Sequence, residues 1–212
     1  MNYIIMCGGI YRKWEKPRQL TEINGEPIIA RTIRLLREAG VRDIAISSND
    51  PVFEQFDVPV LIHDNDFNNL YEDGRIGCWC NAFYPTDEPA CYVCGDVVFS
   101  PEAIRTIVET QTDSIEFFAS SPPFAPGYIK HHGEPFAFKV VDQKRFRAAI
   151  NFVLANKDTG IFSRPPIAWE LWQVIRGRDV REIDFDSYVA INDYTCDIDG
   201  PNDVERIEAC IT

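Results

Sequence analysis

The sequence predicts a single α/β domain with a mixed, mainly parallel sheet flanked by helices, and two observations lead to that prediction. Short apolar runs alternate with amphipathic segments from the first residues onward, which is typical of a sheet wrapped by crossover helices. The chain has 212 residues and 45% hydrophobic content, enough for one core of ordinary size. We therefore treat residues 1–212 as one domain.

Seven apolar runs have the length and composition expected of strands. They are residues 3–6, 43–48, 58–63, 90–94, 114–120, 135–141 and 188–192. Because amphipathic segments separate most of them, we expect crossover connections and mostly parallel neighbours.

The most regular helical pattern covers residues 27–40, where Ile29, Ile33 and Leu36 share one face and Gly40 suits the C-terminal cap. Similar spacing predicts further helices over residues 74–84, 100–111, 142–158, 166–175 and 200–211. Residues 121–135 are rich in Pro and Gly, which break both helix and central strand. We expect a surface loop there.

The charge balance limits the possible ligands. A net charge of −12 argues against a surface for nucleic acid or an anionic membrane, because clustered Lys and Arg hold phosphate backbones. Residues 1–42, however, contain eight basic and four acidic side chains, which fits a small anionic ligand near the N-terminus. There is no charged segment followed by an apolar leader, and no run approaches the roughly 18 apolar residues that span a bilayer. We expect a cytoplasmic protein.

The seven cysteines are an odd number in a chain too long to need disulfides. Most lie in apolar segments, which predicts reduced, buried thiols; examples are Cys7, Cys91, Cys94 and Cys210. A zinc site is the alternative interpretation of Cys78-x-Cys80 followed by Cys91-x-x-Cys94. The "ACYVC" segment has the composition of a strand, where positions three apart face opposite sides, and this disfavours zinc.

The first apolar run ends in Gly8-Gly9, and four basic residues follow over residues 12–18. Two glycines let the backbone approach a ligand, and the amides that follow can point at phosphate oxygens while Arg and Lys neutralise them. A tight turn with solvated basic residues is the alternative. The glycine pair matches neither G-x-x-x-x-G-K-[ST] nor G-x-G-x-x-G.

The N-terminal segment as a whole resembles the sugar-nucleotide and related nucleotidyltransferases, whose pattern is A-G-G-x-G-x-R, P-K-x-L, G-x-P-[LI]-[IL] and a helix ending in A-G. The matching positions are Cys7-Gly8-Gly9, Arg12, Pro17-Arg18-Gln19-Leu20, Gly25-Glu26-Pro27-Ile28-Ile29 and Ala39-Gly40. The chain departs from the pattern twice. Its loop is one residue shorter and lacks the second glycine, and Arg18 replaces the usual lysine.

The resemblance extends to residue 207. "ACYVCGDVVFS" is similar to the family's strand ending in G-D, which implies that Asp96 binds a catalytic divalent metal. "DIDGPNDVERIE" resembles D-I-D-[ST]-P-E-D-[LF], which implies Asp197 or Asp199 as a second ligand. As alternatives, Asp96 is a turn former or helix cap, and the other two lie in a solvated turn. "NDFNNLYEDGRIG" resembles a stretch of cytidylyltransferases that activate phosphocholine-like acceptors.

The resemblance implies a GT-A-type, Rossmann-like nucleotidyltransferase fold. It also implies transfer of a nucleotidyl group from an NTP, with CTP favoured and UTP next, to a phosphorylated small molecule. Mg²⁺ or Mn²⁺ would be the cofactor, and the protein would be a monomer or homodimer. A nucleotide-sugar-dependent glycosyltransferase and a non-catalytic nucleotide-binding protein are the alternatives.

The resemblance assigns a role to each candidate site residue. Arg12 and Arg18 are the predicted catalytic residues. The predicted nucleotide contacts are Cys7, Gly8, Gly9, Ile10, Asn68 and Asn69. The acceptor-side loop is expected over residues 121–136, and its predicted contacts are His131, His132 and Glu134.

Overall fold

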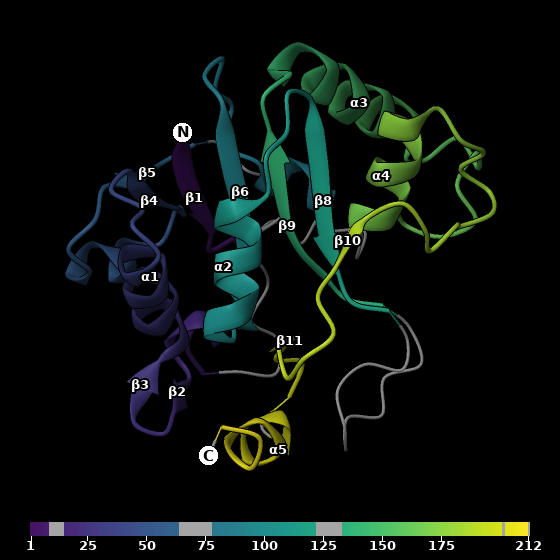
Figure 1. The fold of residues 1–212 in the computed structure, drawn as a ribbon. Helices are drawn as coiled ribbons and strands as arrows, with labels where there is room; N and C mark the ends of the chain where they lie inside the picture. The colour runs from purple at the N-terminus through teal and green to yellow at the C-terminus, as the bar shows by residue number, and fades with distance from the viewer. Residues whose placement is uncertain (9–14, 64–77, 122–132, 201, 212) are drawn as a thin grey trace.

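The structure is a computed structural model that describes residues 1–8, 15–63, 78–121, 133–200 and 202–211. Seven strands form one sheet in the order β10-β8-β9-β6-β1-β4-β5 (Figure 1). They are β1 (Asn2–Met6), β4 (Ile44–Ser47), β5 (Val60–Leu61), β6 (Ala90–Cys94), β8 (Ile115–Ala119), β9 (Pro135–Val140) and β10 (Val189–Ala190). Each of the seven predicted runs overlaps one of these strands. All pairs in the sheet are parallel except those that β9 makes with β6 and β8.

Five α-helices accompany the sheet in the described residues. They are α1 (Ile28–Glu38), α2 (Pro101–Glu109), α3 (Gln143–Asn156), α4 (Ala168–Arg176) and α5 (Asn202–Glu208). Gly40 follows α1 with a φ of 87°, in the left-handed region that favours glycine at a helix end. The Ser100 side chain caps α2 by accepting a hydrogen bond from the amide of Ala103. These five helices confirm five of the six helical predictions.

The sixth predicted helix, over residues 74–84, is wrong in its described part. Residues 78–84 contain only the 3-10 turn η4 (Trp79–Ala82), and residues 74–77 lie outside the described residues. Phe83 ends this turn with extended backbone and packs edge-to-face against Tyr92 and Phe146, at centroid distances of 5.0 and 4.9 Å. Packing against the sheet and α3 therefore explains the apolar spacing that suggested a helix.

Two further predictions are corrected. The loop predicted over residues 121–136 ends too late, because β9 begins at Pro135; residues 122–132 lie outside the described residues. A proline is tolerated at the first position of a strand, and Phe136 is fully buried. Six of the seven cysteines are buried as predicted, but Cys210 is exposed, because it lies beyond the end of α5.

Successive residues of β9 contact helices on opposite faces of the sheet. Phe138 stacks on Phe117 of β8 with ring centroids 4.5 Å apart, and α3 and α4 cover this aromatic face through Phe146 and Trp172. The next residue, Lys139, points to the other face. Its ammonium group donates hydrogen bonds to three carbonyls at the end of α2, those of Ile107, Val108 and Thr110, at 2.8, 2.9 and 2.7 Å. The sheet therefore lies between α2 and the α3–α4 pair.

A second, smaller core joins the two ends of the chain. It contains the hairpin β2 (Glu22–Ile23) and β3 (Glu26–Pro27), and the antiparallel pair β7 (Val97–Val98) and β11 (Cys196–Asp197). The buried residues that form it are Ile23, Ile28, Val98, Cys196, Ile198 and Ile207. Ile207 belongs to α5, so this core holds α5 near the start of α1, as Figure 1 shows at the bottom of the molecule. Two 3-10 turns complete the described elements, η1 (Arg18–Leu20) and η2 (Pro51–Gln55).

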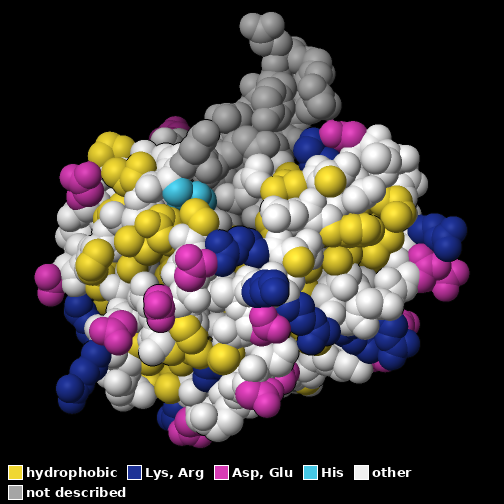
Figure 2. Space-filling model, turned by 90° about the horizontal axis from the view of Figure 1, so that it is seen from above, with side chains coloured by type: hydrophobic (Ala, Val, Ile, Leu, Met, Phe, Trp, Pro, Cys, Tyr) yellow, Lys and Arg dark blue, Asp and Glu magenta, His cyan; other side chains and the backbone are white. Residues whose placement is uncertain are grey.

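The surface at the edge of the sheet where β1 begins is seen in Figure 2. The basic and acidic side chains of the described residues are interspersed on this face. None of the described helices has the length and apolar character needed to cross a membrane.

The Lys139 contacts predict a measurable contribution to stability. Lys139→Met should lower the free energy of unfolding by about 2 kcal/mol, because partly buried carbonyls at the end of α2 lose a charged donor. Urea denaturation measures this change, and the exposed Lys144 of α3 provides the control variant Lys144→Met. Equal stability of the two variants would contradict the assigned role.

Candidate functional site

The pairing of β1 with β6 places two predicted site residues at one edge of the sheet. These strands are parallel neighbours, with Met6 opposite Cys94 at their carboxyl ends. Gly8 and Asp96 follow directly and line the same pocket. The carboxyl edge of a mainly parallel sheet is the usual position of a ligand site in α/β folds.

Gly95 allows the two strand ends to approach closely. Its amide donates a hydrogen bond to the carbonyl of Met6 at 3.0 Å. A Cβ atom at Gly95 would lie 2.5 Å from that carbonyl oxygen and 2.8 Å from the sulfur of Cys7. Only glycine therefore fits between β1 and Asp96 without displacing the backbone.

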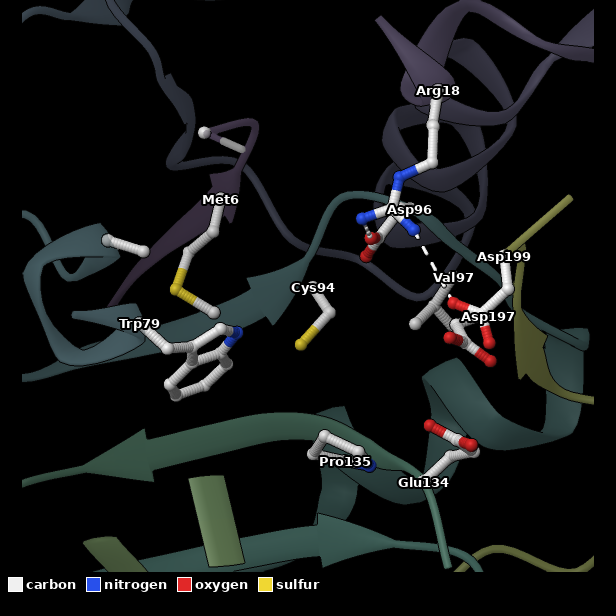
Figure 3. Close-up of a pocket in the computed structure, with 12 residues that line it drawn as sticks. Met6, Arg18, Trp79, Cys94, Asp96, Val97, Glu134, Pro135, Asp197 and Asp199 are labelled. Carbon is white, nitrogen blue, oxygen red and sulfur yellow. Dashed lines mark ion pairs between the residues drawn. The ribbon is translucent and has the colours of Figure 1, made fainter. Parts of the chain in front are cut away.

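Arg18 connects this edge to the C-terminal segment. It begins η1, and its Nη2 lies 2.7 Å from Oδ2 of Asp96. Its Nη1 donates to the carbonyl of Ile198 at 2.9 Å and lies 3.6 Å from Oδ1 of Asp199. Figure 3 shows the guanidinium group beside Asp96 and on the same side of the pocket as Asp199. One arginine thus binds two of the three predicted metal ligands.

The third predicted ligand, Asp197, lies in β11, opposite Val97 of β7. A polar clamp between α2 and the C-terminal segment holds this strand in place. Ser100 donates to the carboxylate of Asp193 at 2.5 Å, and its amide donates to the hydroxyl of Thr195 at 3.0 Å. The clamp fixes the segment just before β11, and with it the position of Asp197.

The pocket has an acidic wall and an apolar wall (Figure 3). The acidic wall carries the carboxylates of Asp96, Glu134, Asp197 and Asp199, with Arg18 as the cation among the described lining residues. The apolar wall consists of Met6, Trp79, Ala82, Cys94, Val97 and Pro135. Among the described lining residues, four carboxylates therefore lie around one guanidinium.

Two thiols border the acidic wall and are inert there. Burial raises the pKa of Cys94 well above its usual value, and the charges of Asp96, Asp197 and Glu134 raise it further. Burial and the charge of Asp96 likewise raise the pKa of Cys7. Both side chains therefore stay protonated near neutral pH and act as packing groups.

The structure brings together only part of the predicted site. Arg18, Asp96, Glu134, Asp197 and Asp199 line the pocket together with Gly8. Cys7 directly follows β1: its thiol is fully buried, its amide donates to the carbonyl of Ser47, and its carbonyl accepts from the hydroxyl of Ser48. The remaining predicted residues lie outside the described residues; they are Gly9, Ile10, Arg12, Asn68, Asn69, His131 and His132.

The acidic wall offers ligand atoms of the kind that a divalent cation binds. Carboxylate oxygens are the ligands that Mg²⁺ and Mn²⁺ prefer, so the chemistry of this donor set fits such an ion. Within the described residues, however, no three His, Cys, Asp or Glu side chains converge as a metal-binding group. Part of the reason is that Asp96 and Asp199 both pair with the guanidinium of Arg18. The described cysteines likewise form no group of ligands for zinc.

Sequence reasoning did not identify the apolar wall. Trp79 falls within the predicted helix over residues 74–84, and Met6 and Cys94 end two predicted strands, yet all three line the pocket. It also missed Gln19, which is buried and whose Nε2 donates to the carbonyl of Gly8 at 3.5 Å. Strand ends were the available signal, because Met6 and Cys94 are the last residues of β1 and β6.

The fold and the pocket together define the class of protein. A mainly parallel sheet carries Gly8, an arginine and several carboxylates at its carboxyl edge. This combination is typical of enzymes that bind a nucleotide and its phosphates.

Comparison with known families identifies the particular group. Residues 3–162 match the family described as the MobA-like NTP transferase domain. The chain belongs to this family of nucleotidyltransferases, which confirms the resemblance found in the sequence.

Solved structures of nucleotidyltransferases have the same fold. An inositol-1-phosphate CTP transferase from T. maritima has a TM-score of 0.55 at 14% identity, covering 99% of this chain and 95% of that one. A putative glucose-1-phosphate thymidylyltransferase from Bacillus anthracis has a TM-score of 0.61 at 15% identity, covering 99% and 94%. A CTP:phosphocholine cytidylyltransferase from Streptococcus pneumoniae has a TM-score of 0.54 at 15% identity, covering 100% and 99%. At these identities the similarity demonstrates the fold alone.

The close approach at Gly95 predicts a cost for any side chain there. Gly95→Ala should lower the free energy of unfolding by about 1–3 kcal/mol, because the added Cβ meets the carbonyl of Met6 and must displace backbone. Gly200→Ala is the matched control, since a Cβ at Gly200 meets nothing within 4 Å. Urea denaturation of both variants makes the comparison. If Gly95→Ala were as stable as the control, the strand ends would not be as tightly packed as described.

Proposed function

We propose that this chain catalyses nucleotidyl transfer from an NTP to a phosphorylated small-molecule acceptor and releases pyrophosphate. CTP is the favoured donor and UTP the next. One observation carries the proposal: Arg18 and three aspartates from distant parts of the sequence line one pocket together with Gly8. Membership of the nucleotidyltransferase family supports the same reaction class.

In the proposed reaction a phosphate oxygen of the acceptor attacks the α-phosphorus of the NTP. A new P–O bond forms, the bond from the α-phosphorus to the bridging oxygen breaks, and pyrophosphate leaves with that oxygen. The protein's task is to align two anions that repel each other and to neutralise the charge that develops. It needs no covalent intermediate.

Arg18 is suited to the transferred phosphate or the acceptor phosphate, because its guanidinium reaches the pocket and can bind two oxygens at once. Arg12 is proposed to hold the β- and γ-phosphates and the leaving pyrophosphate. Mg²⁺ or Mn²⁺ held by Asp96 with Asp197 or Asp199 would neutralise oxygens of the α-phosphate when bound.

The two substrates are proposed to bind on different sides of the pocket. Gly8, Gly9 and Ile10 would contact the nucleotide together with Asn68 and Asn69. The acceptor would contact Glu134, which lies at the start of β9, where its amide donates to the hydroxyl of Ser120 at 2.9 Å.

His131 and His132 would complete the acceptor side of the pocket. CTP is favoured because "FNNLYE" resembles cytidylyltransferases, and two of the structures with the same fold are named as users of CTP. We also propose a cytoplasmic location, where NTPs are available.

Substrate preference provides the first test. CTP, UTP, ATP and GTP are offered at equal concentration with a panel of phosphorylated sugars, polyols and amino alcohols, and pyrophosphate release is measured. We expect the highest rate with CTP, since the proposed nucleotide contacts resemble those of cytidylyltransferases. A clear preference for UTP would favour a sugar-phosphate uridylyltransferase. Nucleotide binding without pyrophosphate release from any pair would contradict the proposal and favour a nucleotide-binding protein.

The carboxylate of Asp96 provides the second test. Asp96→Asn should lower kcat on the order of 10²-fold or more while the fold persists, because an amide is a weak ligand for a hard cation and carries no charge. Asp87→Asn is the matched control, since Asp87 also pairs with an arginine, Arg147, but on the surface. Pyrophosphate release and thermal unfolding are measured for both variants. Wild-type rates of Asp96→Asn at saturating Mg²⁺ would exclude Asp96 from the metal site.

A further inference from the structure

Arg18 competes for the carboxylates that are proposed to hold the divalent cation. Its two terminal nitrogens divide between Asp96 on one side and Ile198 and Asp199 on the other. A cation placed on Asp96 and Asp199 would need the same oxygens. Arg18 and a divalent ion are therefore alternative partners of one carboxylate pair.

The pairing with Asp96 is sheltered enough to matter. The side chains of Arg18 and Asp96 are 22% and 23% exposed, and their closest nitrogen and oxygen lie 2.7 Å apart. Solvent and salt screen such a pair less than an ion pair on the surface. The contact to Asp199 is longer, 3.6 Å, and that side chain is 58% exposed, so Asp96 is the stronger partner.

The identity of residue 18 is important for this competition. A lysine at this position would present only a single point charge. The planar fork of arginine presents two nitrogens on different sides, which allows it to span Asp96 and the C-terminal segment. The departure from the family pattern thus creates a bridge between the two parts of the acidic wall.

We propose that Arg18 is a resident counter-ion of the divalent-cation site. It pairs with Asp96 and Asp199 until a phosphate group binds the guanidinium and draws it away, which ends the competition between Arg18 and the metal. Phosphate and divalent cation then bind cooperatively, each raising the affinity for the other by the same factor. This inference rests on the proposed function, because it uses the same pocket and the same metal ligands.

The test measures metal binding and does not use activity. Mn²⁺ alone, in phosphate-free buffer, is titrated into the whole protein, and free Mn²⁺ is measured by electron paramagnetic resonance. Arg18→Gln should bind Mn²⁺ about five-fold or more tightly than the wild type, the lower end of typical coupling between sites. Arg18→Gln/Asp96→Asn should lose this gain, which would locate the gain at Asp96.

Arg34→Gln is the matched control for charge. Arg34 also binds two carboxylates, those of Glu26 and Glu38 at 2.7 and 3.0 Å, but on the exposed side of α1. Its removal changes the net charge equally and should leave Mn²⁺ affinity unchanged. An equal gain in both single variants would reduce the effect to overall charge and overturn the proposal. So would Mn²⁺ binding by Arg18→Gln that is no tighter than in the wild type, or is undetectable.

Inorganic phosphate tests the coupling itself. The ratio of the Mn²⁺ affinities of Arg18→Gln and wild type should fall toward one as phosphate is added, since phosphate displaces Arg18 only in the wild type. The ratio cancels the Mn²⁺ that phosphate binds in solution. A ratio that does not change with phosphate would overturn the cooperative part. Arg18→Lys, which keeps the charge but cannot span both carboxylates, serves if Arg18→Gln does not fold by circular dichroism.

The outcome is separable from that of the proposed function. Pyrophosphate release by the wild type with unchanged Mn²⁺ affinity in the Arg18 variants would remove the counter-ion role and leave the transferase. Tighter Mn²⁺ binding by the Arg18 variants, without pyrophosphate release by the wild type, would keep the counter-ion role and remove the transferase.

Discussion

The parallel pairing of β1 with β6 is the constraint on which the site depends. It sets Met6 against Cys94, so that Gly8 and Asp96 follow neighbouring strand ends and line the same pocket. Gly95 keeps this distance short because its amide binds the carbonyl of Met6 and no Cβ intervenes. Every charged group of the pocket is placed relative to this pair of strand ends.

The C-terminal segment is attached to that frame by a different kind of contact. Its hydrogen bonds run through β7 and β11 and through the clamp of Ser100, Asp193 and Thr195. Apolar packing of Ile198 and Ile207 supports them in the smaller core. The acidic wall is therefore assembled from two units that are joined by these polar contacts, by the smaller core and by Arg18.

The sequence predicted the elements that depend on local signals and missed those that depend on distant contacts. All seven strands of the sheet were predicted, since each is a short apolar run between amphipathic segments. The helix over residues 74–84 was predicted wrongly in its described part. Trp79 lines the pocket and Phe83 packs against Phe146 of α3, and the spacing of these two residues also suits a helix. The family pattern indicated that Arg18 and Asp96 belong to one site. It did not reveal that they bind each other, because that contact depends on the position of β6 relative to η1.

The order of the pocket residues along the chain has a consequence for synthesis on the ribosome. Gly8, Arg18, Asp96 and Glu134 all leave the ribosome before β11, which carries Asp197. Until the last segment emerges, β7 lacks its partner strand and the smaller core lacks Cys196, Ile198 and Ile207. The acidic wall is therefore completed only after β11 and Asp199 have been made. A nascent chain that ends before β11 lacks half of the aspartates and glutamates that line the pocket.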